Sequence, residues 1–149
     1  MKTIVVGANW ITKYFIADTL YNDGNFEEYI QVLSPEPIEE FFESFPKLQE
    51  FQGDERLSYV QSTAMEARPN LNLEYTDSIY IDNNTDAIGF IEFLHDKKFT
   101  KRVVLASSWE VYGWKGRNKV PIDPREQPNP ETQFGEVKYL QELSLTASN

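Results

Sequence analysis

Short apolar runs rich in β-branched residues alternate along the chain with segments of helical spacing. The strand-like runs are Lys2–Val6, Tyr29–Leu33, Leu57–Thr63 and Arg102–Ala106. Apolar residues recur three or four positions apart, as on one face of a helix, in the segments 11–21, 38–45 and 77–96. Alternating strands and helices are typical of a parallel sheet with helices on both faces. The pattern therefore predicts an α/β fold with a doubly wound parallel sheet of four or five strands.

The segment LQEFQGDERL, residues 48–57, does not fit this alternation. It could form a strand that ends at Gly53-Asp54, but too few residues would then separate it from the strand that starts at Leu57. A parallel crossover needs about a dozen residues or more. Either a helix has been lost between two strands, or the segment is a helix end followed by a loop. We favour the helix end and loop.

Length and composition describe a globular chain with a single domain, residues 1–149. A chain of 149 residues buries one substantial core but is short for two. Its formal net charge of −10 repels phosphate backbones and anionic membrane surfaces, so we expect neither nucleic acid nor a membrane as partner. The absence of cysteine excludes disulfides and cysteine-ligated metals. No apolar run has the length of a membrane span or the features of a signal peptide, so we expect a cytoplasmic protein. Metal ligands would have to be carboxylates, and clusters such as Glu39, Glu40 and Glu43 look like a solvated helix face, so we expect no metal site.

Three later segments carry the motifs of a known family. TDAIGFIEFLHD is followed by KRVVLASSWEVYG and then by VPIDPREQPNPETQFGEVKYLQEL. In this order they resemble the extended short-chain dehydrogenase/reductases, the NAD-dependent epimerase/dehydratase family that acts on nucleotide sugars. Two segments match the family's motifs, T-[ND]-x-x-G at 85–89 and A-S-S-x-x-V-Y-G at 106–113, and the region of the Y-G-x-x-K motif reads FGEVK at 134–138. The resemblance covers the nucleotide-binding half of such an enzyme, and it implies a Rossmann-like sheet with Lys2–Val6 at the centre and Arg102–Ala106 further out.

The resemblance also implies a catalytic arrangement, and one of its atoms is missing. Ser108 would hydrogen-bond the reacting hydroxyl, and a tyrosine one helical turn before Lys138 would remove its proton as hydride leaves for NAD. In that geometry the ammonium can lower the pKa of the phenol. Phe134 occupies the tyrosine position and has no oxygen, so this position offers no general base. We interpret Ser108 as a turn hydroxyl that binds backbone and Lys138 as a solvated helix residue, both relic positions.

The loop after the first predicted strand lacks the glycines of a dinucleotide site. Such sites use three glycines, for a tight turn, for close approach of backbone to the pyrophosphate and for packing of helix on strand. Gly7 stands at the first position, but the later positions hold Asn9 and Thr12 in one register, or Trp10 and Lys13 in the other. Both registers put side chains where the pyrophosphate approaches bare backbone.

Some residues of the cofactor region could nevertheless support residual binding. A helix N-terminus offers donors to an anion, and Asn tolerates turn conformations. The second predicted strand ends without the acidic residue that binds ribose hydroxyls in the family, which leaves only weak substitutes downstream. The candidate cofactor residues are Gly7, Asn9, Trp10, Ile11, Glu36 and Asp54. We expect NAD(P) to bind weakly or not at all.

Two classes of function remain in competition. The first is a noncatalytic pseudoenzyme with a Rossmann fold, kept as a binding or protein-interaction module. The second is an active NAD(P)-dependent nucleotide-sugar epimerase, dehydratase or reductase, completed by another subunit. The family pairs subunits through two helices, which correspond here to 77–96 and 133–145, so we also expect a homodimer. The apolar residues predicted on their outer faces are Tyr80, Phe93, Tyr139 and Leu143.

Overall fold

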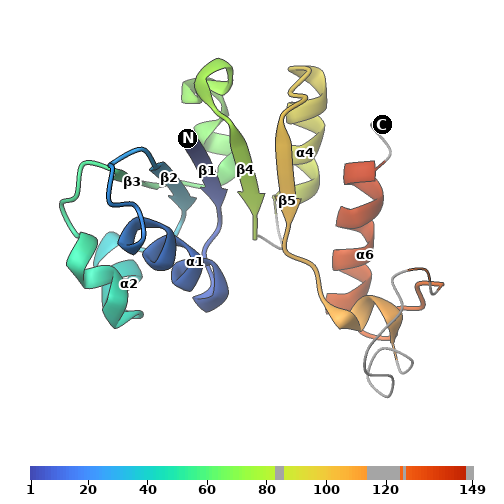
Figure 1. Ribbon diagram of the computed structural model, residues 1–149. Coiled ribbons are helices and arrows are strands. Elements are labelled where there is room, and N and C mark those ends of the chain that lie inside the picture. The colour runs from blue at the N-terminus through green and yellow to red at the C-terminus, as the bar shows by residue number, and fades with distance from the viewer. Residues whose placement is uncertain (83–85, 114–124, 126, 147–149) are drawn as a thin grey trace.

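Five parallel strands form one sheet in the order β3-β2-β1-β4-β5 (Figure 1). The computed structural model describes residues 1–82, 86–113, 125 and 127–146. The strands are β1 (Lys2–Val6), β2 (Tyr29–Ser34), β3 (Leu57–Gln61), β4 (Ser78–Ile81) and β5 (Arg102–Leu105). The predicted α/β class is confirmed, with β1 at the centre of the sheet and β5 at one edge.

Helices cover both faces of this sheet. The α-helices are α1 (Trp10–Tyr21), α2 (Ile38–Glu43), α3 (Ala64–Ala67), α4 (Ala87–Asp96) and α6 (Gln133–Thr146). The 3-10 segments are η1 (Pro46–Phe51), η2 (Arg68–Asn70), η3 (Leu73–Tyr75) and η4 (Trp109–Tyr112). Helices α1 and α2 pack with η1 on one face, while α3 and α4 cover the other. Helix α6 stands beyond β5 and packs against α4 and η4 (Figure 1).

The predicted helix over 77–96 is wrong in its first part. Ser78–Ile81 form strand β4, and the helix α4 starts only at Ala87. Because β4 lies between β1 and β5 under helices on both faces, Ile79 and Ile81 are fully buried, and so short an apolar run cannot be told from a helix by periodicity. With this strand the sheet has five strands, the larger of the two expected numbers. Residues 48–57 are, as expected, a helix end and a loop, here η1 and the turn at Gly53.

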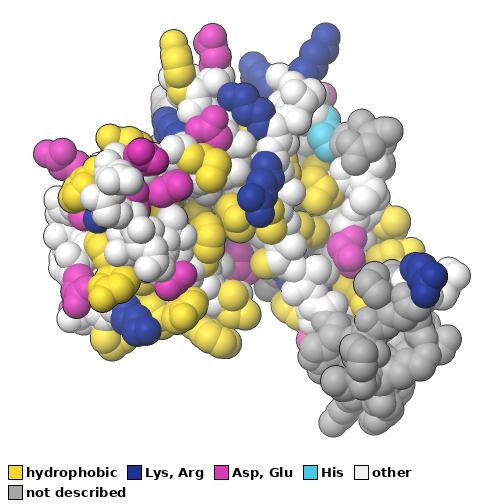
Figure 2. Space-filling model, in the orientation of Figure 1, with side chains coloured by type: hydrophobic (Ala, Val, Ile, Leu, Met, Phe, Trp, Pro, Cys, Tyr) yellow, Lys and Arg dark blue, Asp and Glu magenta, His cyan; other side chains and the backbone are white. Residues whose placement is uncertain are grey.

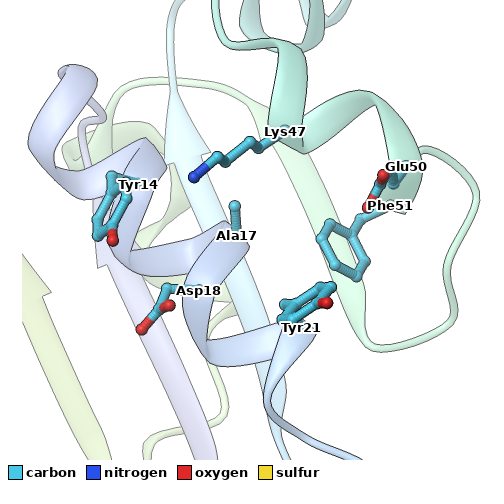
Figure 3. Close-up of a pocket in the computed structure, with 7 residues that line it drawn as sticks. All are labelled: Tyr14, Ala17, Asp18, Tyr21, Lys47, Glu50 and Phe51. Carbon is cyan, nitrogen blue, oxygen red and sulfur yellow. The ribbon is translucent and has the colours of Figure 1, made fainter.

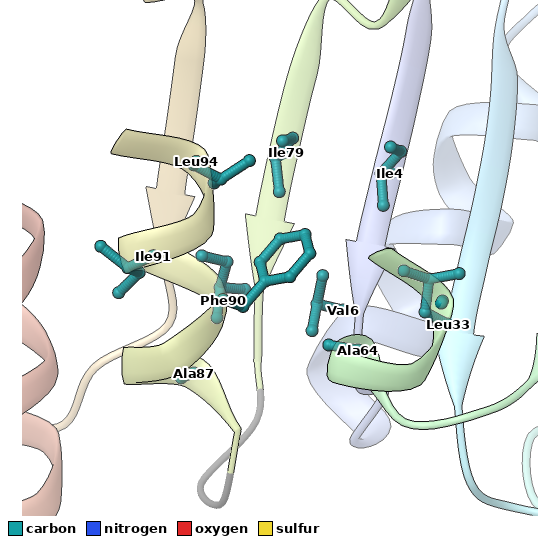
Figure 4. Packing of buried hydrophobic residues seen from close by; sticks show 11 residues of the cluster. Ile4, Val6, Leu33, Ala64, Ile79, Ala87, Phe90, Ile91 and Leu94 are labelled. Atoms are coloured by element: carbon teal, nitrogen blue, oxygen red, sulfur yellow. The ribbon is translucent and has the colours of Figure 1, made fainter. Parts of the chain in front are cut away.

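Alternation along the strands divides the core into two layers. Ile4 and Val6 of β1 point to the α4 side, where they pack in one cluster with Phe90 (Figure 4). Val5 points to the opposite face and packs in a second cluster with Ile16 of α1. A period of two along a strand that is buried on both sides produces this division. No helix among the described residues is long and apolar enough to cross a bilayer.

Candidate functional site

The carboxyl end of β1 leads through a tight turn into α1. Gly7 adopts a φ of 74°, in the left-handed region that favours glycine, and its N–H donates to the Leu33 carbonyl at 2.7 Å. Asn9 then caps the helix, since its Oδ1 accepts the N–H groups of Ile11 at 2.9 Å and Thr12 at 3.2 Å. The turn therefore keeps the first glycine of a dinucleotide loop but uses a side chain where that loop has bare backbone.

Asp82, the residue after β4, reaches the same helix end. Its Oδ1 accepts the Asn9 side-chain amide at 2.9 Å, and its Oδ2 accepts the Asn9 backbone N–H at 3.2 Å. The Thr12 hydroxyl donates to the same Oδ2. A carboxylate is stabilised at this end by the positive pole of the helix. Asp82 thus occupies the place where a helix N-terminus otherwise accepts an external anion.

This arrangement does not fit the pyrophosphate of a dinucleotide. The side chains of Asn9 and Thr12 fill the close approach, and the backbone N–H groups of Asn9, Ile11 and Thr12 are already bonded within the chain. A phosphate placed there would also meet the negative charge of Asp82 at short range. Trp10 and Ile11, the other candidates in this loop, are exposed on the first turn of α1.

The acidic candidates Glu36 and Asp54 lie in different places. Glu36 follows β2 at the carboxyl edge of the sheet, and its carboxylate is paired with the buried Lys13 at 3.0 Å. Lys13 also donates to the Ser44 hydroxyl at 2.6 Å. Asp54 precedes β3 and binds Arg56 at the opposite, amino edge of the sheet. The prediction that Asp54 lies in the cofactor region is therefore wrong. In a parallel sheet the residue before β3 lies at the edge opposite the β1–α1 turn.

Phe134 and Lys138 lie one turn apart on α6, as their spacing predicts. The Lys138 Nζ lies 5.7 Å from the centroid of the Phe134 ring. The predicted solvated lysine is wrong, because only 3% of Lys138 is exposed. Among the described residues its Nζ forms one hydrogen bond, to the Gln141 Oε1 at 3.5 Å, and no ion pair. Burial lowers the pKa of Lys138, and the charge of Asp82 partly offsets this effect.

Ser108 has the turn role that was expected for it. Its Oγ accepts the N–H of Glu110 at 3.1 Å and caps the short η4 segment. The Glu110 carboxylate in turn accepts the Thr132 hydroxyl at 3.0 Å, which links η4 to the start of α6. A Cβ on Gly135 would lie 2.5 Å from the Glu110 carbonyl oxygen, so this contact requires glycine. The glycine of the Y-G-x-x-K motif thus has a packing reason that is independent of catalysis.

Sequence reasoning missed Asp82, which is hydrogen-bonded to one candidate region and acts by its charge on the other. It is bonded to the turn after β1, and its charge acts on Lys138. The signal that could have found it is an acidic residue directly after a buried apolar run, but that run had been assigned to a helix. Thr85 and most of the segment VPIDPREQPNP, residues 120–130, lie outside the described residues. Within the described part of the chain, no group of three His, Cys, Asp or Glu side chains is arranged to hold a metal ion.

No protein-family model and no curated protein matches the sequence, whereas the structure has clear relatives. A dTDP-glucose 4,6-dehydratase from Bacillus anthracis in complex with NAD matches 99% of the chain with a TM-score of 0.78 and 14% identity. UDP-glucuronic acid 4-epimerase from Bacillus cereus, in complex with UDP-glucuronic acid and NAD, matches 99% with a TM-score of 0.71 and 16% identity. A short-chain dehydrogenase/reductase superfamily protein from Agrobacterium tumefaciens with bound NAD matches 97% with a TM-score of 0.67 and 16% identity.

These matches confirm the resemblance at the level of fold. The chain has the Rossmann-like fold that is found in about half of the dehydratase and of the epimerase. It spans 50% of the dehydratase and 52% of the epimerase, about half the length of either protein. Identities of 14% and 16% relate the folds and not the activities.

Proposed function

We propose that this chain is a cytoplasmic, noncatalytic Rossmann-type domain that acts as a protein-interaction module and does not use NAD(P). The observation that carries the proposal is the carboxylate of Asp82 at the N-terminus of α1. In the dehydratase and the epimerase that share the fold, NAD is bound. In this chain the corresponding turn is filled by an internal anion and by two side chains that hold it.

The energetic argument rests on what a bound dinucleotide would displace. Admitting a pyrophosphate would require Asp82 to leave the Asn9 amide, the Asn9 N–H and the Thr12 hydroxyl. Each hydrogen bond to a charged group contributes about 1.5–3 kcal/mol, so their loss opposes binding. If Asp82 stayed, two like charges would share one helix end. Phe134 adds an independent argument, because a missing general base typically lowers the rate by about two to four powers of ten.

Calorimetry with NAD and NADP tests the binding half of the proposal. We expect no heat of binding at micromolar to low-millimolar dinucleotide for the wild type. Asp82→Asn removes the charge from the turn, while Asp77→Asn makes the same change at the amino edge, where Asp77 accepts the Lys2 N–H at 2.8 Å. Detectable binding by Asp82→Asn alone would support the assignment of Asp82 as the blocking anion. Micromolar binding by the wild type would overturn the proposal.

Product analysis with UDP- and dTDP-sugars tests the catalytic half. We expect no hydride transfer or epimerisation by the wild type, and none by Phe134→Tyr, because the altered turn remains in that variant. Turnover by the wild type would defeat the proposal and favour the alternative, an active enzyme completed by a second subunit. Turnover by Phe134→Tyr alone would show an intact site that lacks one oxygen, which also contradicts the proposal.

Self-association through α4 and α6 remains part of the proposal. Helix α6 exposes Leu140 and Leu143, which supports an apolar contact there. Tyr80 no longer contributes, since it belongs to β4 and stacks on Phe15 with 4.5 Å between ring centroids. Sedimentation at tens of micromolar is expected to give a dimer for the wild type and a monomer for Leu143→Glu. A monomeric wild type would remove the basis for this contact.

A further inference from the structure

A cavity of about 380 Å³ opens between α1 and η1, on the outer side of α1 (Figure 3). Its lining is Tyr14, Ala17, Asp18, Tyr21, Lys47, Glu50 and Phe51. Two elements that pack against each other form its walls, so the cavity is part of the folded scaffold. It lies along the helix, away from the turn that Asp82 blocks, so an occupant here would not compete with that contact.

Helix α1 is aromatic on its outer face, where a surface helix is normally polar. Tyr14 is 48% exposed and Tyr21 76%, and Trp10, one turn before Tyr14, is 70% exposed. Figure 2 shows hydrophobic side chains gathered over the α1 and α2 side of the molecule, with carboxylates among them. Exposed aromatic residues on one helix face are typical of surfaces that bind another protein, because Trp and Tyr are enriched among the residues that dominate binding energy.

The charges of the cavity favour a cation. Asp18 and Glu50 contribute two carboxylates against the single ammonium of Lys47. Among the described residues, no hydrogen bond or ion pair holds the Glu50 carboxylate. The Lys47 Nζ already lies 5.2 Å from the centroid of the Tyr14 ring, so a ring face of this cavity accepts a positive charge within the chain itself.

The same chain shows how it holds a guanidinium. Arg56 is bound by the carboxylates of Asp23 and Asp54 and stacks over the Phe26 ring at 4.2 Å. Its guanidinium also lies 5.9 Å from the centroid of the Phe51 ring, a ring that lines the cavity as well. The cavity is lined by groups of the same kinds, carboxylates and aromatic rings. A planar guanidinium matches this set better than an ammonium does, because it stacks on rings and pairs with a carboxylate through two donors.

We infer that the α1–η1 cavity binds an arginine side chain of a protein partner, with Trp10 and Tyr21 contacting apolar residues beside that arginine. This inference rests on the proposed function, since it names the chemistry of the partner that an interaction module would bind. The net charge of −10 of the whole chain attracts a basic segment at long range. A free organic cation would engage the cavity but not Trp10, which lies outside its lining.

The test is a titration of the full chain with blocked peptides, followed by amide shifts in proton–nitrogen NMR spectra. A Leu-Arg-Leu peptide is expected to bind saturably, with shifts at Tyr14, Tyr21 and Glu50. The same peptide with citrulline in place of arginine has the same shape without charge and is expected to bind at least about fivefold more weakly. Equal binding of the two peptides, or no saturable shift in the cavity, would overturn the inference.

Substitutions in and near the cavity are each expected to change the affinity for the peptide in a stated direction. Glu50→Gln weakens arginine binding about threefold or more, and Lys47→Met strengthens it, since the competing ammonium is gone. Glu43→Gln removes the same charge from α2 outside the cavity and leaves the affinity unchanged within about 1.5-fold. Equal weakening by Glu43→Gln and Glu50→Gln would reduce the effect to overall charge and contradict the inference.

Two further measurements test whether the ligand is a protein segment or a small cation, and whether the proposed function holds independently of the cavity. Trp10→Ala is expected to weaken the binding of the Leu-Arg-Leu peptide but not that of free arginine amide. If the wild type bound the two ligands equally well, the cavity would be a site for a small cation, which would contradict the inference. Titration with NAD in the same spectra reports on the amides of Gly7 and Asn9. Shifts there with NAD would contradict the proposed function while leaving the arginine result to decide the cavity.

Discussion

Two buried cations, at different places in the fold, meet opposite surroundings. Arg56 at the amino edge of the sheet and Lys138 on α6 are 6% and 3% exposed. Arg56 forms ion pairs with Asp23 and Asp54 at 3.1 and 2.9 Å, and its pKa is raised, chiefly by the hydrogen bonds from its guanidinium to Asp54. Among the described residues, the only hydrogen bond of the Lys138 ammonium is a long one to an amide oxygen, and burial lowers its pKa.

The difference teaches that burial alone does not determine what a charge does for the fold. Arg56 also donates to the backbone carbonyls of Leu20 and Asp23, so it joins the end of α1 to the start of β3. Its desolvation is repaid by the hydrogen bonds, whereas that of Lys138 is not. In open α/β sheets ligands bind outside the carboxyl ends of the strands, so the Arg56 ion pairs at the amino edge lie away from that region.

The largest effect is expected from Arg56→Met. The substitution leaves the carboxylates of Asp23 and Asp54 without their cation, and two backbone carbonyls lose a donor. We expect the free energy of unfolding, measured by urea denaturation, to fall by about 2–3 kcal/mol. Arg56→Lys keeps the charge but not the planar fork and should lose less. If Arg56→Met lowered the free energy of unfolding by less than about 0.5 kcal/mol, the ion pairs of Arg56 would not stabilise the fold as the comparison with Lys138 requires.

Lys138→Met is expected to act in the opposite direction. It removes the desolvated charge and keeps an unbranched side chain against the Phe134 ring. The free energy of unfolding should rise by about 1 kcal/mol at neutral pH, within the range found when buried charges are replaced by apolar residues. Lys97→Met, an exposed lysine at the end of α4, serves as the matched control and should change stability by less than about 0.5 kcal/mol. Destabilisation by Lys138→Met would show that the ammonium is better paired than its contacts indicate.

The smallest effect is expected in the pH dependence of stability. The pKa of Asp54 is lowered by its side-chain hydrogen bond from Arg56, and that of Asp23 by the backbone N–H of Glu27, so their contribution is complete above about pH 4. It is lost as the pH falls through the folded pKa values, and Arg56→Met should reduce this loss.

The sign is reversed for Lys138 at alkaline pH. A lysine whose folded pKa is lowered costs stability while it is charged, and the cost disappears as the pH rises through that pKa toward about 10.4. The difference in unfolding free energy between Lys138→Met and wild type should therefore shrink on the alkaline side. A difference that is constant from pH 7 to pH 10 would contradict a lowered pKa.

The sequence predicted the fold well where its signals were local. The β-branched run at Lys2–Val6 and the helical spacing at 11–21 are properties of neighbouring residues, and both elements were found. Strand β4 was missed because four apolar-rich residues buried on both faces have no distinctive period. Where this strand ends and α4 begins depends on which residues pair with β1, a long-range contact that local patterns do not show.

The candidate site was predictable in part. Departures from the glycine loop at Asn9 and Thr12, and the missing oxygen at Phe134, are visible by position, and the structure places side chains there as expected. The burial of Lys138 was misjudged, because it depends on how α6 packs on α4 and η4. Asp82 was not identified because its partners lie about seventy residues earlier in the chain.

That separation has a consequence for the order in which the molecule assembles. Asn9 can cap α1 as soon as the helix forms, since it lies two residues before Ile11. The bonds from Asp82 span 73 and 70 residues, so they require that β4 has already docked beside β1. Closing so long a loop costs entropy before any contact compensates for it. The first turn of α1 therefore completes its hydrogen bonds only after β4 has paired with β1. Protection of this turn would report that β4 has docked during folding.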